Sequence, residues 1–242
     1  MQAFAPGVDV TYLILVVGAL FVHACYQLGV SVLTHMSAHT LSRKASVKRL
    51  AWLGGSYSVG AIVATTLLLV ALVSLPLLAP EANRSRAAEL FSALVIGLVP
   101  LVGLATVFWY YRRGDGTQLW LPRPVAGYLL ERSRKTKRGF EAFLLGAGTV
   151  VGELPFIVAP MLIVGLLIST QPSALWLPLS LLYAVLACLP LLVVTGYLTS
   201  GHSVARVQRW REKSKVFLQW TSGLALILLT IFLTALQVGA TQ

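Results

Sequence analysis

The chain has 242 residues, of which 57% are hydrophobic and only 11% are charged, and its net charge is +11. Soluble domains carry about 25% charged residues, so this composition excludes an ordinary soluble protein. The mean hydropathy of +0.81 is that of a chain lying mostly within a lipid bilayer.

The apolar residues form continuous blocks of about 20, without the alternation of a membrane barrel, and therefore predict transmembrane helices. In chain order the six predicted spans are residues 10–32, 56–78, 90–111, 140–169, 174–199 and 217–238. No lysine or arginine precedes the first span, as a cleaved signal peptide would require, so we expect this helix to remain in the mature protein. The predicted fold is all-α, a polytopic membrane helical bundle in a single domain, residues 1–242.

The first span carries unusual polar residues. His23 and Gln27 are one turn apart on the same helix face, so His23 can accept a proton or bind a soft metal. The alternative is a histidine that makes one interhelical hydrogen bond. Cys25 lies on another flank. His35 and His39, a second pair one turn apart, are weak metal-ligand candidates because no acidic third ligand is near them in the sequence.

The basic residues orient the helices. All but two of the 19 lysines and arginines fall in residues 43–49, 112–138 and 206–215, three loops that six crossings place on one side. By the positive-inside rule this side is the cytoplasm, so we expect both termini to be extracytoplasmic and the protein to lie in the inner membrane. This distribution also indicates that the positive charge meets anionic lipid headgroups and not nucleic acid.

Six such crossings predict two halves of opposite topology, an inverted repeat that is typical of secondary transporters. Gly18-Ala19 and Gly146-Ala147 open similar segments in the first and fourth spans. The divisions are half one at about residues 10–111, a cytoplasmic linker at 112–139 and half two at about 140–238.

The linker predicts either a short amphipathic helix on the membrane surface, with Tyr128, Leu129 and Leu130 on one side, or a plain basic tether. Just before it, the aromatic residues 109–111 are typical of an interfacial belt and not of a binding site.

Glu153 is the only acidic residue in the interior of a predicted span, since Glu141 lies at the cytoplasmic end of the fourth. Intramembrane acids normally face a bundle interior or a water-filled cavity because burial of their charge is costly. Pro155 predicts a kink or break just past this acid, and a free carbonyl near Val151 that could help to bind the same ion. We expect an ion-coupling site made of Glu153, His23, Pro155 and Gln27. The alternative is a neutral glutamate hydrogen-bonded to a neighbouring helix.

Several motifs resemble a known family. The fourth span, GFEAFLLGAGTVVGELPFIVAPMLIVGLL, is rich in glycine with spaced prolines. The fifth span contains Tyr183 and Leu189-Pro190, and the last span opens with Ser222-Gly223. Together with the first-half segment SRKASVKRLAWLGGSYSVGAIV, these features resemble the LysE-type transporter superfamily, which includes the CcdA/DsbD-like membrane electron carriers.

The resemblance implies a six-helix transporter scaffold. The thiol-transfer branch carries a cysteine beside a proline in the first span and another in the fourth. In this chain Cys25 lies in the first span without an adjacent proline, and Cys188 lies in the fifth span. These two cysteines form either a redox couple or inert buried packing.

The leading hypothesis is a secondary transporter or exporter of a small solute or ion, coupled through the intramembrane carboxylate. The alternatives are a CcdA-like thiol electron carrier and a non-transporting partner subunit of a membrane complex. No GxSxG, HExxH or phosphate-loop motif is present, so enzyme activity other than electron transfer is not predicted. The expected partners are membrane lipids and a second copy or another membrane protein, and no cofactor is predicted.

Overall fold

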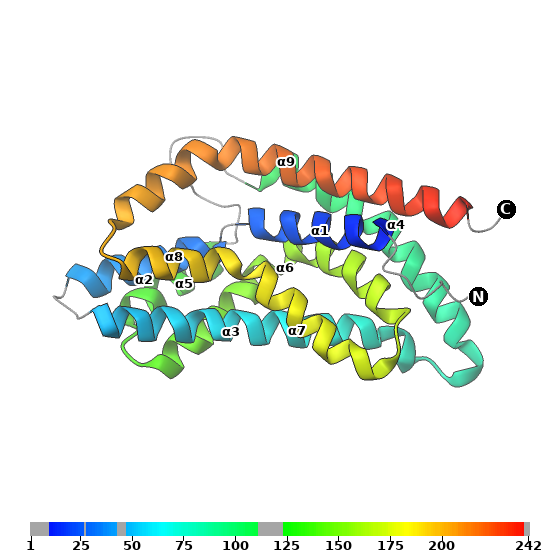
Figure 1. Ribbon diagram of the computed structural model, residues 1–242, viewed down its shortest axis with the longest axis horizontal. Coiled ribbons are helices and arrows are strands. Elements are labelled where there is room, and N and C mark those ends of the chain that lie inside the picture. The colour runs from blue at the N-terminus through cyan, green and yellow to red at the C-terminus, as the bar shows by residue number, and fades with distance from the viewer. Residues whose placement is uncertain (1–9, 27, 43–46, 111–122, 240–242) are drawn as a thin grey trace.

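The computed structural model describes residues 10–26, 28–42, 47–110 and 123–239, and none of these residues forms a strand. Long helices run side by side along one axis of the molecule (Figure 1). In chain order the helices are α1 Val10–Cys25, α2 Leu28–Ser42, α3 Val47–Ser74, α4 Arg84–Trp109, α5 Arg123–Lys135, α6 Gly139–Ser169, α7 Trp176–Ala187, α8 Leu189–Thr199 and α9 Val204–Gly239. Short 3₁₀ turns lie at Leu75–Leu78, Glu81–Asn83 and Ser173–Leu175.

Several of these helices are long and apolar enough to cross a membrane. Among the described residues, the five such stretches are Val10–Ala38, Val47–Leu78, Glu81–Trp109, Gly139–Ser169 and Val204–Leu236. A sixth is formed by α7 and α8, whose axes differ by 45°. Every predicted span falls on one of these stretches, so the prediction of a multi-helix membrane fold is confirmed.

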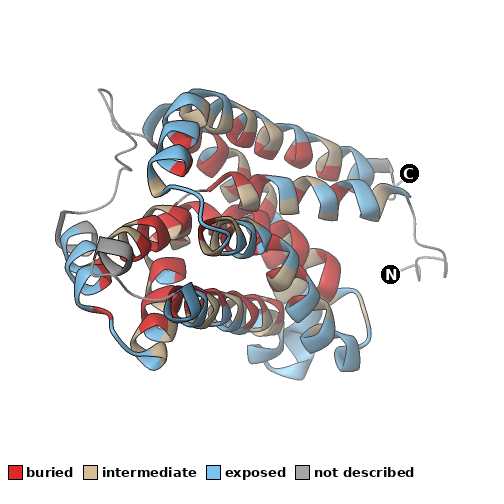
Figure 2. Ribbon diagram, turned by 60° about the vertical axis from the view of Figure 1, so that its left-hand side comes forward, coloured by how far each residue is buried: buried red, intermediate tan, exposed pale blue. Residues whose placement is uncertain are grey.

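The helix α6 is the central element of the bundle. It contacts α1, α2, α3, α4, α5 and α7, and the buried residues of the molecule line the inward faces of these helices (Figure 2). Its closest partner is α3, where two glycines remove the side chains that would separate the backbones. A Cβ atom added at Gly60 would lie 2.0 Å from the carbonyl oxygen of Phe143, and one added at Gly146 would lie 2.0 Å from that of Tyr57. Small residues at such crossings allow the close backbone approach typical of membrane helices.

The linker helix α5 belongs to the bundle, because it packs against α2 and α6. Leu129 is buried against Gly152 of α6, whereas Tyr128 and Leu130 are exposed. The prediction that these three residues share one side is wrong, because successive residues of a helix point about 100° apart.

The two ends of the bundle differ in charge. The start of α1 and the end of α9 lie at one end of the molecule, and α5 and the first turns of α3 and α9 lie at the other (Figure 1). The second end therefore carries the described basic residues of α3, α5 and α9 and is called the basic end below.

Candidate functional site

The first membrane stretch is two helices, because α1 ends at Cys25 and α2 begins at Leu28. The N–H of Tyr26 donates to the carbonyl of His23, at 3.2 Å, in the last turn of α1. The first N–H groups of a helix have no partner within it, and the N–H of Leu28 donates across the bundle to Oε1 of Glu153 at 2.9 Å. Glu153 therefore caps the start of α2, where the helix dipole favours a negative charge.

The same carboxylate oxygen binds a second helix end. The hydroxyl of Tyr110, the residue after α4, donates to Oε1 of Glu153 at 2.5 Å. Tyr110 is only 2% exposed, and its ring packs edge-on against Phe156, with the centroids 4.9 Å apart. The prediction of an interfacial aromatic belt is thus wrong for Tyr110, although Trp109 is 59% exposed and lies outside the bundle. Tyr111 lies outside the described residues. Glu153 thereby connects α6 to the start of α2 and to the end of α4.

A second break faces the first. The helices α7 and α8 meet at Cys188, and Pro190 lies in the first turn of α8. A small cavity of about 40 Å³ lies between the two breaks. Its polar and cysteine side chains are those of His23, Tyr26, Thr65, Thr149, Glu153 and Cys188. A water molecule needs roughly 10–15 Å³ of such volume, so the cavity has space for a few waters or a bare ion and excludes an organic solute.

Hydrogen bonds between helices hold the residues around this cavity. His23 Nδ1 lies 3.0 Å from the hydroxyl of Tyr183, which joins α1 to α7. The hydroxyl of Tyr57 lies 2.9 Å from the carbonyl oxygen of Gly29 and 2.9 Å from Oγ1 of Thr149. Each break is therefore tied to an unbroken helix or to the other broken span.

The predicted break in α6 does not occur. This helix continues from Gly139 to Ser169 through Pro155 and Pro160. Val151 and Pro155 are exposed, while Glu153 is 8% exposed and points into the bundle, because residues two positions apart lie on nearly opposite faces of a helix. The free carbonyl near Val151 is therefore not part of the site, and neither is Pro155.

The other predicted site residues are distributed unevenly. His23 and Cys188 line the cavity with Glu153, and Cys25 is buried at the end of α1. Both cysteines are free thiols. Gln27 and the side chain of His39 lie outside the described residues, and His35 is half-buried on α2. Within the described part of the chain, no group of three or more histidine, cysteine or acidic residues could hold a metal ion.

Arg211 is a residue that the sequence assigned only to membrane orientation. It lies on α9, is 2% exposed, and is close enough to Glu153 and His35 to interact with them electrostatically. A buried cation that acts on a buried carboxylate makes both more tolerable in the interior. The sequence signal for this burial was faint: Arg211 lies one turn after Val207, which is also buried.

Counting along the helices gives the depth of the site below the end of the bundle opposite the basic end. The helix α1 has 16 residues before the break, which is about 24 Å at 1.5 Å per residue. Glu153 precedes the end of α6 by the same 16 residues, whereas Cys188 follows the start of α7 by 12 residues, or about 18 Å. Each of these lengths exceeds half of a hydrocarbon core of about 30 Å.

The chemistry available here is that of a carboxyl group, which can release or accept a proton. Either change would alter the strength of its hydrogen bonds to the start of α2 and the end of α4. The small cavity beside it is large enough for water or a bare ion. Comparisons of the chain with protein-family models, with curated proteins and with solved structures find no match, so the function has to be argued from the site itself.

Proposed function

We propose that the protein is a secondary transporter or exporter of a small solute or ion, coupled through protonation of Glu153. The observation that carries this proposal is the pair of hydrogen bonds that Glu153 accepts from Leu28 and Tyr110, at the break in the first span. Broken helices around an ionisable group are a common way for transporters to build a binding site.

Protonation would change the hydrogen bonds that close the site. Hydrogen bonds to an ionised carboxylate are roughly twice as strong as neutral ones, so the charged form of Glu153 holds α2 and Tyr110 firmly. A proton on Glu153 weakens both bonds and frees the start of α2 to move away from α6. The cavity of about 40 Å³ then belongs to a closed state, and substrate enters when α2 moves.

Helix packing supports part of the proposed inverted repeat. With three helices in each half, α1 corresponds to α6 and α4 to α9. The pair α1–α9 is then equivalent to the pair α6–α4, and both pairs are in contact. The two breaks fall in the first and fifth spans, which are not equivalent, so the halves have diverged at the site. The excess of basic residues at one end supports a cytoplasmic position for that end.

Glu153→Gln tests the coupling, because glutamine keeps the shape and a hydrogen-bond acceptor but cannot ionise. In proteoliposomes loaded with a pH-sensitive dye, we expect the wild type to move protons when amino acids or metal cations are added singly from a panel. Glu153→Gln should fold normally and lose at least tenfold of this flux. The matched control is Glu89→Gln, the same change at an exposed position on α4, which should keep full flux.

A fully active Glu153→Gln protein would contradict the proposal and make the carboxylate structural. The hypothesis of a non-transporting partner subunit would then be favoured.

The second candidate is a CcdA-like thiol electron carrier. It is favoured by the positions of the two free cysteines, since Cys25 is the last residue of α1 and Cys188 connects α7 to α8. Both thiols therefore lie at the breaks that face each other across the candidate site.

Cys25→Ser and Cys188→Ser distinguish the two functions. If the protein is a transporter, we expect both variants to keep their flux, because buried thiols in membrane helices normally only pack. The measurement is the same dye assay, with wild type and Glu153→Gln as the two references. A Cys25–Cys188 disulfide that is reduced by a thioredoxin-like partner, detected by a mobility shift after thiol alkylation, would reverse the ranking.

A further inference from the structure

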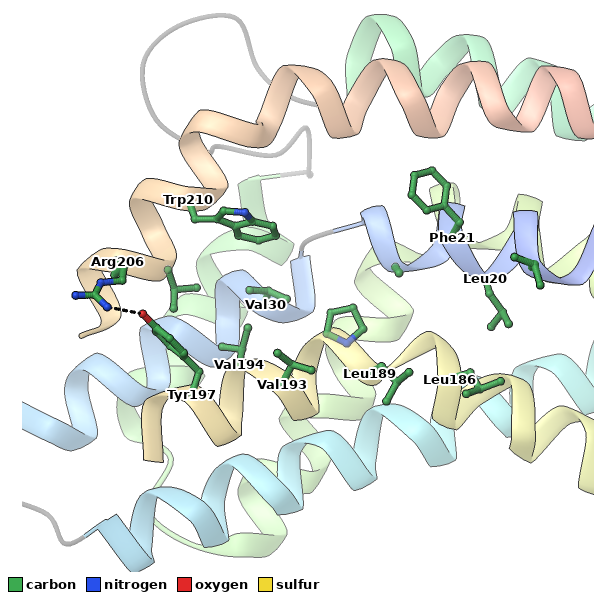
Figure 3. A pocket seen from close by; sticks show the side chains of 14 residues that line it. Leu20, Phe21, Val30, Leu186, Leu189, Val193, Val194, Tyr197, Arg206 and Trp210 are labelled. Atoms are coloured by element: carbon green, nitrogen blue, oxygen red, sulfur yellow. Dashed lines mark hydrogen bonds between the residues drawn. The ribbon is translucent and has the colours of Figure 1, made fainter. Parts of the chain in front are cut away.

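A long apolar groove opens on the side of the bundle, separate from the cavity at Glu153. Its volume is about 820 Å³, within the range of roughly 300–1,000 Å³ for ligand sites. The groove runs between α1 and α9 on one side and α7 and α8 on the other, as Figure 3 shows. Its lining residues come from five helices, with Val30 of α2 at its floor.

The polar groups of the groove are gathered at one end. Along α1 and α7 the walls are aliphatic or aromatic, with Leu20, Phe21 and Leu186 among them. At the basic end, Nη1 of Arg206 donates to the hydroxyl of Tyr197 at 3.2 Å, and the indole of Trp210 lies nearby (Figure 3). Tryptophan and tyrosine are enriched at the level of lipid headgroups.

Arg206 is the charged residue among those that line the groove. Among the described residues no carboxylate forms an ion pair with Arg206, whose polar partner is the hydroxyl of Tyr197. Of the charged residues that follow it in the first turns of α9, four are basic and one, Glu212, is acidic. The charge that complements this end of the groove is therefore an anion.

One occupant matches both ends of the groove. A phospholipid has a long apolar chain and one charged head, in the same order as the groove has its aliphatic walls and its arginine. The groove opens between helices that are long and apolar enough to cross a membrane, where the surrounding solvent would be lipid. A water-soluble solute would find few polar partners along the aliphatic walls.

We propose that this groove binds an anionic membrane phospholipid, with an acyl chain along α1 and α7 and the phosphate at Arg206. The site does not depend on the proposed transport function. Val30 and Pro190 line both the groove and the cavity at Glu153, so a bound chain would touch both helix breaks.

The preference of the groove for one phospholipid over another should come from the lipid headgroup. A chain that leaves the bilayer for an apolar groove gains little, because lipid is as apolar as the groove wall. A basic residue near a lipid headgroup contributes enough to favour an anionic lipid about fivefold. The groove should therefore select phosphatidylglycerol over phosphatidylcholine with the same chains by roughly this factor.

The test is native mass spectrometry of the purified full chain, delipidated and titrated with phosphatidylglycerol or phosphatidylcholine. We expect one phosphatidylglycerol to bind about fivefold more tightly than phosphatidylcholine in the wild type. Arg206→Gln should remove this preference and leave phosphatidylcholine binding unchanged. Val193→Trp, which fills the open side of the groove, should weaken both lipids at least tenfold.

Leu228→Trp is the matched control, because it adds the same indole at an exposed position of α9 away from the groove, and it should bind both lipids as the wild type does. Thermal unfolding of each variant verifies that it is folded. A second readout is quenching of Trp210 fluorescence by phosphatidylglycerol with brominated chains, with Trp210→Phe as the background.

Three results would overturn the proposal. The first is equal binding of the two lipids by the wild type. The second is unchanged lipid binding by a folded Val193→Trp protein, which would place the lipid elsewhere. The third is competition by glycerol phosphate as effective as that by the lipid, because the site would then bind an anion without a chain.

Discussion

Tyr110 and Leu28 determine how tightly Glu153 is held, because both donate a hydrogen bond to its Oε1. Tyr110 offers a side-chain hydroxyl, whereas Leu28 offers a backbone N–H that no substitution except proline removes. Tyr110 is therefore the residue through which the hydrogen bonding of the carboxylate can be changed without altering the backbone.

Tyr110→Phe should lower the stability of the protein while leaving its fold intact. Removal of an interhelical hydrogen bond within a membrane bundle costs about 0.6–2 kcal/mol, and the phenyl ring preserves the packing against Phe156. We expect a lower midpoint of thermal unfolding in detergent. Tyr128→Phe on α5 makes the same change at an exposed position and should leave the midpoint unchanged. Equal midpoints for Tyr110→Phe and the wild type would mean that the bond adds nothing to stability.

At this scale the sequence predicted the acid but not its partners. Glu153 stood out because a charged residue in an apolar run has few explanations. Tyr110 did not, because tyrosine beside a basic loop is equally typical of a membrane interface. Leu28 donates through its backbone N–H, which every residue except proline has. The residue type at this position therefore gives no sign of the hydrogen bond. Arg211 was hidden among exposed basic residues of the same kind.

Among the elements, α3 and α6 depend most on backbone contact. Gly60 meets the carbonyl of Phe143 so closely that no side chain can be added without moving a helix. Gly55, five residues earlier on α3 and on a different face, has nothing within 4 Å of its added Cβ.

These two glycines give a matched pair of variants. Gly60→Ala should destabilise the bundle by more than 2 kcal/mol, because overpacking against a backbone cannot relax cheaply. Gly55→Ala should be neutral or more stable by up to about 1 kcal/mol, because alanine favours helix over glycine. Unfolding of both proteins in detergent, followed by circular dichroism, provides the comparison. If the two variants were equally stable, the close α3–α6 contact would not hold in the membrane.

Helix breaks were the part of the architecture that sequence patterns predicted least well. Pro155 was expected to break α6, yet a proline inside a long helix removes only one hydrogen bond, and packing on six neighbouring helices keeps α6 continuous. Pro190 does mark a break, because proline fits the first turn of the new helix α8. The break after Cys25 has no proline at all, and it depends on a carboxylate supplied by another span.

For the whole molecule, the apolar runs alone were sufficient to locate every span, because the thickness of a bilayer fixes how long a crossing must be. They could not establish how the halves pack or which side is cytoplasmic. Both properties depend on contacts or on the insertion process and not on local hydropathy.

The topology can be measured directly. With the basic end in the cytoplasm, a reporter fused after Gln242 should be extracytoplasmic, since α1 begins and α9 ends at the opposite end of the bundle (Figure 1). Alkaline phosphatase, which is active only outside the cytoplasm, should be active in this fusion. Fusion after Lys137, in the linker, should be inactive and serves as the reference. An inactive terminal fusion would overturn the orientation and the even number of crossings.

The hydrogen bond between Leu28 and Glu153 also determines the order in which the two halves reach their final structure during synthesis. The two residues are 125 positions apart, so α2 leaves the ribosome long before its cap exists. Until the fourth span is inserted, the first turn of α2 has no carboxylate within the membrane and must remain hydrated or stay near the membrane surface. The first half of the protein can therefore insert early, but its first span takes its final form only when the second half arrives.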